Sequence, residues 1–139
     1  MPQKIAAFCR ETGQPEPTTP GEFVRCALES LALLYRRTLL MLEDLTGMKI
    51  ERLHIVGGGS KNTLLNQFAA NSVQRPVVTG PVEATAAGNI MVQALARGDL
   101  PSLTAARQVI ANSSETTTVQ PKDAAQWQRQ HERFEQLCK

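Results

Sequence analysis

The sequence predicts an α/β fold in which helices surround a short parallel sheet. Helical and β-rich segments alternate along the chain, in the order helix, strand, helix, strand, helix. The two β-rich segments, residues 51–56 and 76–78, are separated by a helical segment over residues 62–73. A crossover of that length joins parallel strands, and strands that alternate with helices are typical of a sheet layered with helices.

The best-marked helix begins after Thr19. Thr19 stands at the N-cap, Pro20 at the first helical position and Glu22 at the third, which together make a capping box. Gly47 is expected to end this helix as its C-terminal glycine. Between these ends, apolar or small residues recur every three or four positions, which predicts a wide buried face that needs two neighbouring elements. These residues are Phe23, Ala27, Leu31, Leu34, Thr38, Leu42 and Leu45.

The remaining segments are shorter. Residues 1–18 are expected to form an irregular lead-in with a short helical start, and residues 19–139 the folded portion. In the helix over residues 62–73, the expected buried face consists of Leu64, Leu65, Phe68 and Ala69. Further helices are expected over residues 84–97, near 104–111 and near 122–137.

Two strands are too few for a stable parallel sheet, because both faces and both edges of such a sheet must be covered. The pattern therefore predicts the second half of an α/β domain whose earlier strands are missing. An uncovered sheet edge favours a homodimer or a domain swap of the fragment.

Composition excludes several classes of protein. The 139 residues are 42% hydrophobic and 20% charged, and the net charge of +2 is spread without a basic block, so nothing indicates nucleic-acid binding. The three cysteines, Cys9, Cys26 and Cys138, form no metal-binding spacing and indicate reduced thiols of a cytoplasmic protein. No apolar run is long enough to span a membrane.

The strongest functional feature is a glycine loop, which consists of Gly57, Gly58 and Gly59 and follows the first β-rich segment. Glycines let the backbone adopt positive φ and let a ligand approach closely. The helix that begins near Asn62 points its free N–H groups and its positive dipole end at the same place. This arrangement predicts a site for a phosphorylated ligand that needs no charged side chain.

Two familiar loops are excluded. Lys61 lacks the spacing and the following hydroxyl residue of a Walker A loop, and Asn62 stands where a dinucleotide fingerprint requires its third glycine. The alternative for the glycine loop is a tight strand-to-helix turn without a ligand.

A second segment, residues 80–89, also follows a strand and is rich in small residues. Close helix packing is the favoured interpretation, with Glu83 stabilising the start of the helix. His54 and His131 have no carboxylate or cysteine placed to form a dyad, and both are interpreted as structural. No residue is identified as catalytic.

Three segments together resemble the C-terminal domain of the FGGY carbohydrate kinases. They are residues 21–32, 53–67 and 80–89. The resemblance implies part of an actin-like, ribonuclease-H-like ATPase fold, in which ATP lies against the C-terminal domain and the sugar is held mainly by the N-terminal one. It also implies that Gly58 contacts ADP directly, that Gly57, Gly59 and Asn62 support the nucleotide, and that Mg²⁺ enters with the nucleotide. Within the family, the likeness is greatest to members that phosphorylate L-rhamnulose at its primary hydroxyl.

A complete kinase of this family is several hundred residues long, and its catalytic aspartate and sugar site precede the segment that the chain resembles. Met1 would then correspond to an internal position, and the isolated chain would be inactive. Two alternatives stay open: a non-catalytic nucleotide-binding or regulatory module, and a structural remnant that binds no nucleotide.

Overall fold

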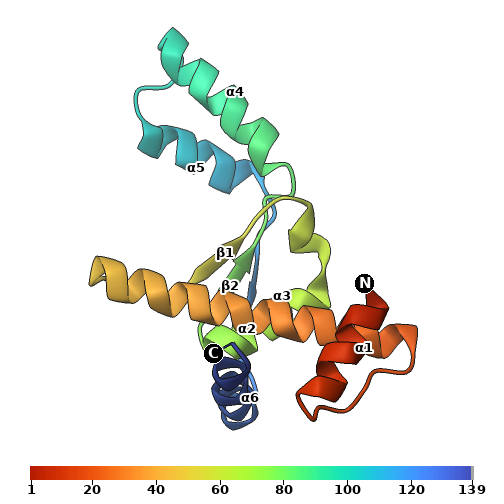
Figure 1. The fold of residues 1–139 in the computed structure, drawn as a ribbon. Helices are drawn as coiled ribbons and strands as arrows, with labels where there is room; N and C mark the ends of the chain where they lie inside the picture. The colour runs from red at the N-terminus through yellow and green to blue at the C-terminus, as the bar shows by residue number, and fades with distance from the viewer. Residues whose placement is uncertain (139) are drawn as a thin grey trace.

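The chain places two helices against one face of a small sheet. The computed structural model describes residues 1–138. Its elements are α1 (Pro2–Glu11), α2 (Pro20–Thr46), β1 (Leu53–Ile55), η1 (Gly58–Lys61), α3 (Thr63–Val73), β2 (Val77–Thr79), α4 (Ala84–Arg97), α5 (Leu103–Ser113), β3 (Thr117–Val119) and α6 (Ala124–Leu137) (Figure 1). The predicted α/β class is confirmed. None of the helices within residues 1–138 is both long enough and apolar enough to cross a bilayer.

The ends of α2 are fixed by the residues that the sequence indicates. Thr19 Oγ1 accepts a hydrogen bond from Glu22 N at 3.3 Å, and Glu22 Oε2 accepts one from Thr19 N at 3.1 Å, so the capping box is complete. Hydrogen bonds from the backbone of Thr18 and Thr19 lower the pKa of Glu22 below its usual value. At the other end, Gly47 is left-handed with φ 67°, and its N–H donates to Glu43 O at 2.8 Å.

The buried face of α2 is not the one that its periodicity predicts. Ala32, Leu33 and Leu39 are buried, whereas Leu34 and Leu45 of the predicted face are 46% and 82% exposed. Apolar residues occur almost all round this helix, so their spacing alone does not identify the side that meets α3. The predicted buried face was therefore wrong at these positions.

The sheet contains a strand that the sequence analysis missed. β1 and β2 are parallel, as predicted, with Leu53 opposite Val77. β3 is antiparallel to β2, with Val119 opposite Val77, and the strand order is β1-β2-β3. The expectation of two strands was wrong because Thr117 and Thr118 are exposed and polar, and three residues are too few to show the alternation that marks a strand.

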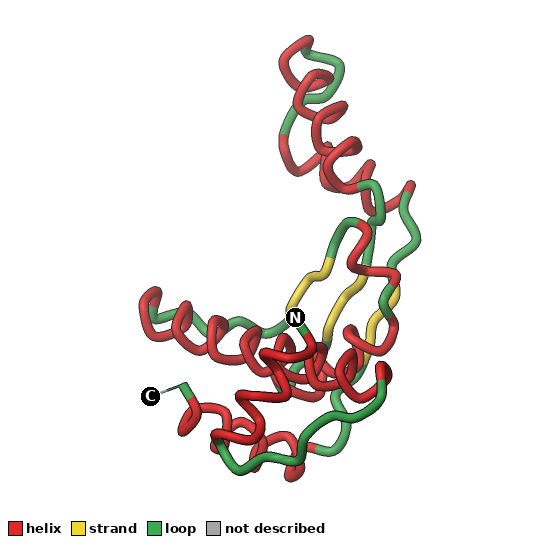
Figure 2. Tube along the Cα trace, turned by 45° about the vertical axis from the view of Figure 1, so that its right-hand side comes forward, coloured by secondary structure: helices red, strands yellow, loops and turns green. Residues whose placement is uncertain are grey.

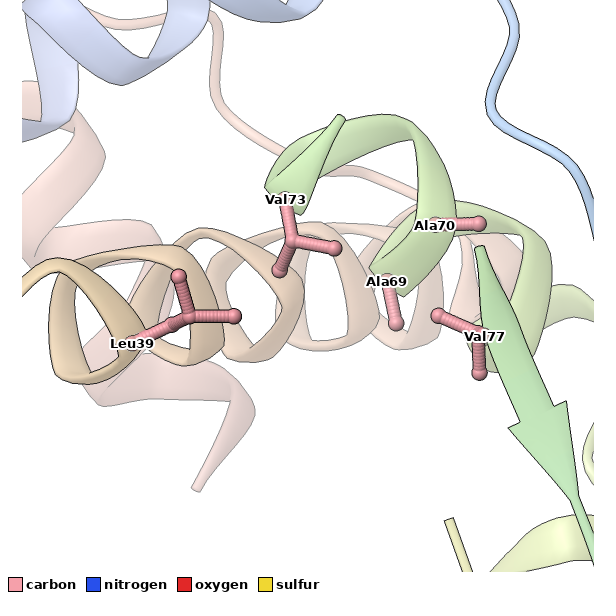
Figure 3. Packing of buried hydrophobic residues seen from close by; sticks show 5 residues of the cluster. All are labelled: Leu39, Ala69, Ala70, Val73 and Val77. Carbon is pink, nitrogen blue, oxygen red and sulfur yellow. The ribbon is translucent and has the colours of Figure 1, made fainter. Parts of the chain in front are cut away.

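The core lies between α2, α3 and the sheet, as Figure 3 shows. Ala69 and Ala70 of α3 are fully buried, and their small side chains let α3 approach both neighbours closely. One cluster of buried residues consists of Leu39, Ala69, Ala70, Val73 and Val77. A second cluster joins α6 to α2 and α3, and its members are Ala32, Leu33, Phe68 and Trp127.

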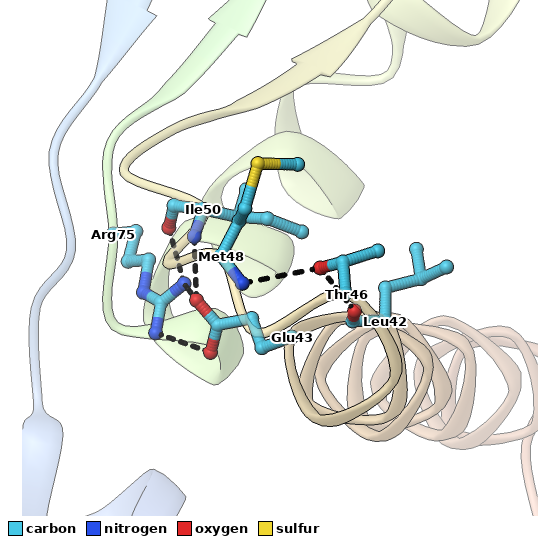
Figure 4. Close-up of polar contacts among 6 residues, drawn as sticks. All are labelled: Leu42, Glu43, Thr46, Met48, Ile50 and Arg75. Carbon is cyan, nitrogen blue, oxygen red and sulfur yellow. Dashed lines mark hydrogen bonds and ion pairs between the residues drawn. The ribbon is translucent and has the colours of Figure 1, made fainter.

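An ion pair fixes the C-terminal end of α2 to the start of β2 (Figure 4). Arg75 binds the Glu43 carboxylate with two contacts, Nη1–Oε1 at 2.6 Å and Nη2–Oε2 at 3.0 Å. Glu43 Oε1 also accepts a hydrogen bond from Ile50 N at 2.5 Å. The hydrogen bonds from Arg75, and then from Ile50, lower the pKa of Glu43 below its usual value. This network positions the linker that leads into β1.

α4 and α5 form a helical hairpin that extends away from the rest of the chain. Both views show the hairpin standing clear of α1, α2, α3 and α6, at the end of the sheet where β2 leads into α4 (Figures 1 and 2). α4 packs mainly against α5 and contains no buried residue. Ile90 and Val92 of α4 are among the large apolar residues that remain exposed.

Candidate functional site

The glycine loop follows β1 and contains glycines in two different conformations. Gly57 has φ 74° and ψ −164°, a region that residues with a side chain rarely occupy. Gly58 and Gly59 begin the short 3-10 helix η1, without a positive φ. A Cβ atom placed on Gly58 or Gly59 would meet nothing within 4 Å. The backbone conformation at position 57 therefore requires glycine, whereas Gly58 and Gly59 leave open space beside the backbone.

Side chains next to the glycines hold the loop in this conformation. Ser60 Oγ donates a hydrogen bond to Gly57 O at 2.7 Å, and Asn66 Nδ2 donates one to Ser60 O at 2.7 Å. Asn66 is buried, and its Oδ1 atom has no hydrogen-bond partner within the described residues. Neither side chain was identified from the sequence as part of the site. The signal for Asn66 was its position, a polar residue one turn after Asn62.

Asn62 caps the helix that follows the loop. Its Oδ1 atom accepts a hydrogen bond from Leu65 N at 3.0 Å, so this oxygen is engaged within the fold. The residues that follow form α3, whose buried side includes Leu65, Phe68 and Ala69, as predicted. Leu64 was also expected on that side but is 47% exposed. The cap directs the N-terminus of α3, with its positive dipole end, toward the loop.

The two segments that the sequence analysis singled out meet at one end of the sheet. β1 and β2 are parallel, so their carboxyl ends lie together. Gly57 N donates a hydrogen bond to Pro81 O at 2.9 Å, which joins the glycine loop to the turn before α4. A Cβ atom on Gly80, which has φ 94°, would lie 2.6 Å from Glu115 O. In open α/β sheets, ligands bind beside the carboxyl ends of the strands.

Several other candidate residues do not join this site. Glu83 is the N-cap residue of α4, but its side chain makes no capping hydrogen bond. His131 is buried on α6, and its Nδ1 atom has no hydrogen-bond partner within residues 1–138. Burial, and then the charge of Arg36, lower the pKa of His131 below its usual value. No group of three His, Cys, Asp or Glu side chains in the described part of the chain could hold a metal ion.

A cavity of about 890 Å³ lies elsewhere, between α1, α2 and α6. Phe8, Leu34 and Phe134 contribute to its apolar lining, and none of the glycine-loop residues does. All three cysteines also line it, and each is a free thiol.

Comparison with known proteins identifies the family. The model for the C-terminal domain of the FGGY family of carbohydrate kinases matches residues 1–97. The rhamnulokinase of Bacteroides thetaiotaomicron is 50% identical over 127 residues, which are 91% of this chain and 26% of that protein. The rhamnulokinase of Pectobacterium atrosepticum is 42% identical over 137 residues, which are 99% of this chain and 28% of that protein.

A solved structure supports the same conclusion. The xylulose kinase from Rhodospirillum rubrum superposes with a TM-score of 0.69 at 25% identity, over 90% of this chain and 25% of that one. The chain thus spans about a quarter of the length of the kinases that it matches. The resemblance to rhamnulokinases, which rested on the three segments of the sequence, is confirmed. The α/β architecture of the chain is part of the actin-like ATPase fold of a sugar kinase, and the chain belongs to the FGGY family of carbohydrate kinases.

Proposed function

We propose that the chain forms the nucleotide-binding wall of an ATP-dependent carbohydrate kinase, with ADP or ATP bound on the glycine loop. The observation that carries this proposal is the meeting of two segments at the carboxyl ends of β1 and β2. The glycine loop and the turn before α4 are joined there by the hydrogen bond from Gly57 N to Pro81 O. Both segments belong to the resemblance with the family.

The loop suits a phosphorylated ligand without a dedicated charged side chain. Gly58 and Gly59 are exposed, and the space beside their Cα atoms is open, so a ligand can approach the backbone directly. The capped N-terminus of α3 adds unpaired N–H groups and a positive dipole end. Gly58 is the proposed contact with ADP, while Gly57, Gly59 and Asn62 shape and support the loop.

Mg²⁺ would enter bound to the nucleotide phosphates. The described residues include no cluster of carboxylates that could hold the ion independently. Its chemical contribution, when bound, is to neutralise charge on the phosphates during transfer. The residues of this chain would bind and orient the nucleotide. The residues that bind the sugar, and the group that accepts the proton of its hydroxyl, would come from the rest of the kinase.

The proposed reaction of the whole kinase is the transfer of a phosphoryl group from ATP to the primary hydroxyl of L-rhamnulose. The names of the relatives support this substrate, and the geometry of this chain does not bear on it because no sugar-binding residue has been identified in it. On this proposal, the chain alone binds nucleotide and catalyses no transfer. The release of ADP by the isolated chain, dependent on rhamnulose, would show that the catalytic group lies within these residues.

Calorimetric titration with ADP tests the site. Replacing Gly58 with valine puts a branched side chain into the proposed ligand space, and nothing within 4 Å of the new Cβ atom obstructs it in the free protein. The affinity for ADP should fall about tenfold or more, because the loss of one hydrogen bond between the ligand and the loop changes the binding free energy by about that much. Gly21→Val is the matched control, since Gly21 also has nothing within 4 Å and lies on α2, outside the loop.

Two outcomes would contradict the proposal. Wild-type chain that is folded and yet binds no ADP would favour the structural remnant. Equal affinities for wild type, Gly58→Val and Gly21→Val would place any nucleotide away from the loop. Binding that is lost only in Gly58→Val would support the assignment.

A further inference from the structure

The peptide that joins Gly57 to Gly58 is held from one side by Ser60. Gly57 O accepts two hydrogen bonds from this residue, one from the hydroxyl Oγ at 2.7 Å and one from the backbone N at 3.1 Å. The peptide is trans, since the only cis peptide bond within residues 1–138 is Gly80–Pro81. In a trans peptide the N–H group points away from the C=O group. The two bonds from Ser60 therefore turn the Gly58 N–H group to the opposite side, away from the Ser60 hydroxyl.

That N–H group has no acceptor within its own helix. The first hydrogen bond of η1 is the one from Ser60 N to Gly57 O, so the N–H groups of Gly58 and Gly59 precede it. Both glycines are exposed, and the space beside their Cα atoms is open. A ligand oxygen can therefore reach a donor whose direction the loop has already fixed.

Two adjacent glycines make this peptide easy to reverse. Reversal leaves the Cα atoms in place and changes ψ of Gly57 and φ of Gly58. Gly58 has no positive φ in this structure, but as a glycine it tolerates the positive φ that the reversed peptide requires. A reversed peptide would present the Gly57 carbonyl oxygen, the negative end of the peptide dipole, to a phosphate. The bonds from Ser60 keep the donor, and not the acceptor, on the open side of the loop.

Asn66 holds Ser60 in turn. The Nδ2 atom of Asn66 donates to Ser60 O at 2.7 Å, and the residue is only 2% exposed. Its backbone is fixed in the first turn of α3, where Asn66 N donates to Asn62 O at 3.0 Å. A buried side chain on a helix is a rigid anchor, so α3 sets the position of Ser60 and, through it, the direction of the Gly58 N–H group.

A direct contact between Ser60 and the ligand is the alternative role for this residue. A serine hydroxyl has one hydrogen to donate, and here that hydrogen goes to Gly57 O. A phosphate oxygen of ADP needs a donor as well. The hydroxyl cannot serve both acceptors, so the geometry favours a role in the loop over a contact with the ligand.

We infer that Ser60 is a positioning residue of the nucleotide site, which directs the Gly58 N–H group toward a phosphate oxygen of ADP, and that Asn66 holds Ser60 in place. We call Asn66, Ser60 and the peptide between Gly57 and Gly58 the loop relay. The inference rests on the proposed function, because it identifies the groups that prepare the proposed contact between Gly58 and ADP.

Calorimetric titration with ADP measures the effect of Ser60. Ser60→Ala removes the hydroxyl, and the Kd for ADP should rise about tenfold, as for the loss of one hydrogen bond to a charged group. Ser60→Thr keeps a hydroxyl and should bind ADP within about twofold of wild type. Ser113→Ala is the matched control. The hydroxyl of Ser113 also donates to a backbone oxygen, Val109 O, at 2.7 Å, but it lies on α5, outside the loop.

A pair of asparagine variants tests the other end of the loop relay. Asn66→Asp removes the donor to Ser60 O, because a carboxylate accepts hydrogen bonds and does not donate them. Asn71→Asp is its control on the same helix, since Asn71 Oδ1 accepts from Gln67 Nε2 and Lys122 N and an aspartate keeps that role. Asn66→Asp should weaken ADP binding about tenfold, and Asn71→Asp should not. Combining Ser60→Ala with Asn66→Asp should cost no more than about twofold beyond the larger single loss, because both act through one peptide.

NMR relaxation dispersion of the backbone amides gives a readout that a loss of stability alone would not change. It detects exchange between conformations on the microsecond to millisecond timescale. In Ser60→Ala without ADP, the Gly58 amide should show such exchange as the peptide reverses, and ADP should suppress it. The same amide should show none in wild type or in Ser113→Ala.

Three results would overturn the inference while the proposed nucleotide site stands. One is a Ser60→Ala chain that binds ADP as tightly as Ser113→Ala does, when Gly58→Val has lost binding. Another is a Ser60→Thr chain that unfolds at the wild-type temperature and yet binds as weakly as Ser60→Ala. The third is additive losses in the double variant, since two independent sites would then be involved. A folded wild-type chain that binds no ADP would instead contradict the proposed function, and this inference with it.

Discussion

Replacing Gly57 with alanine should destabilise the fold, whereas the same replacement at Gly58 should not. Gly57 has φ 74° and ψ −164°, and Gly58 has no positive φ. A Cβ atom on Gly57 would lie 3.9 Å from Val82 O, an ordinary contact, so the cost comes from the backbone and not from a clash. A residue with a side chain in that region is strained by about 1–3 kcal/mol.

Gly58→Ala has the opposite expectation. Its Cβ atom would meet nothing within 4 Å, and alanine reduces the conformational freedom of the unfolded chain. Such a replacement, where the native conformation permits it, stabilises a protein by about 0.4–1 kcal/mol. The two neighbouring substitutions should therefore change the free energy of unfolding in opposite directions, by a difference of roughly 1.5–4 kcal/mol.

Thermal and urea unfolding followed by circular dichroism would measure this difference. For a chain of this size, 1 kcal/mol corresponds to a change in Tm of roughly 3–5 °C, so Gly57→Ala should unfold at a visibly lower temperature than Gly58→Ala. Equal stability of the two variants would refute the assignment of the loop conformation. A loss of stability in Gly58→Ala alone would show that the open space beside Gly58 is filled in solution.

Three further predictions concern the framework of the site. Gly80→Ala should destabilise the chain by at least about 1–3 kcal/mol from its positive φ alone, with a further cost from the contact of the new Cβ atom with Glu115 O at 2.6 Å, and urea unfolding that matches wild type would contradict it. Leu39→Ala should cost about 2–5 kcal/mol because Leu39 is a buried core residue, while the neighbouring, partly exposed Leu40→Ala should cost clearly less. The pKa of His131 is lower in the folded chain than the unfolded value, so the neutral histidine contributes stability that is fully present above about pH 6.5 and is lost as the pH falls through the folded pKa. As the pH falls below about 6.5, the Tm of wild type should therefore fall more steeply than that of His131→Gln, and parallel curves would assign the acid sensitivity to other groups.

Local signals in this sequence predict local structure well. The capping box at Thr19 and the C-terminal glycine Gly47 depend only on residues within one turn, and both form as expected. The strand at Leu53–Ile55 and its parallel partner at Val77–Thr79 also form. The helix of eleven residues between them is a crossover connection, which joins parallel strands. The position of the glycine loop at the carboxyl end of β1 follows from the same order of elements.

The features that were missed depend on contacts between distant segments. β3 is identified by its pairing with β2, since Thr117 and Thr118 carry no apolar alternation of their own. The buried side of α2 is decided by where α3 packs, because the apolar residues of α2 surround the helix. Asn66 became part of the candidate site only because the loop folds back over α3, which brings Ser60 O within 2.7 Å of its side-chain amide.

The proposed nucleotide site depends on β1. The inward groups of β1 are paired with β2, its carboxyl end continues into Gly57, and no strand within residues 1–138 pairs with its outward groups, on His54 and Val56. A strand with one open edge is freer to shift than a strand held on both sides. Because Gly57 N donates to Pro81 O across the end of the same ladder, any shift of β1 also moves the glycine loop relative to the turn before α4. Covering the edge of β1 should therefore make the glycine loop and the turn before α4 more rigid. A more rigid site loses less entropy on binding, so the site should bind ADP more tightly within the whole kinase than in this chain alone.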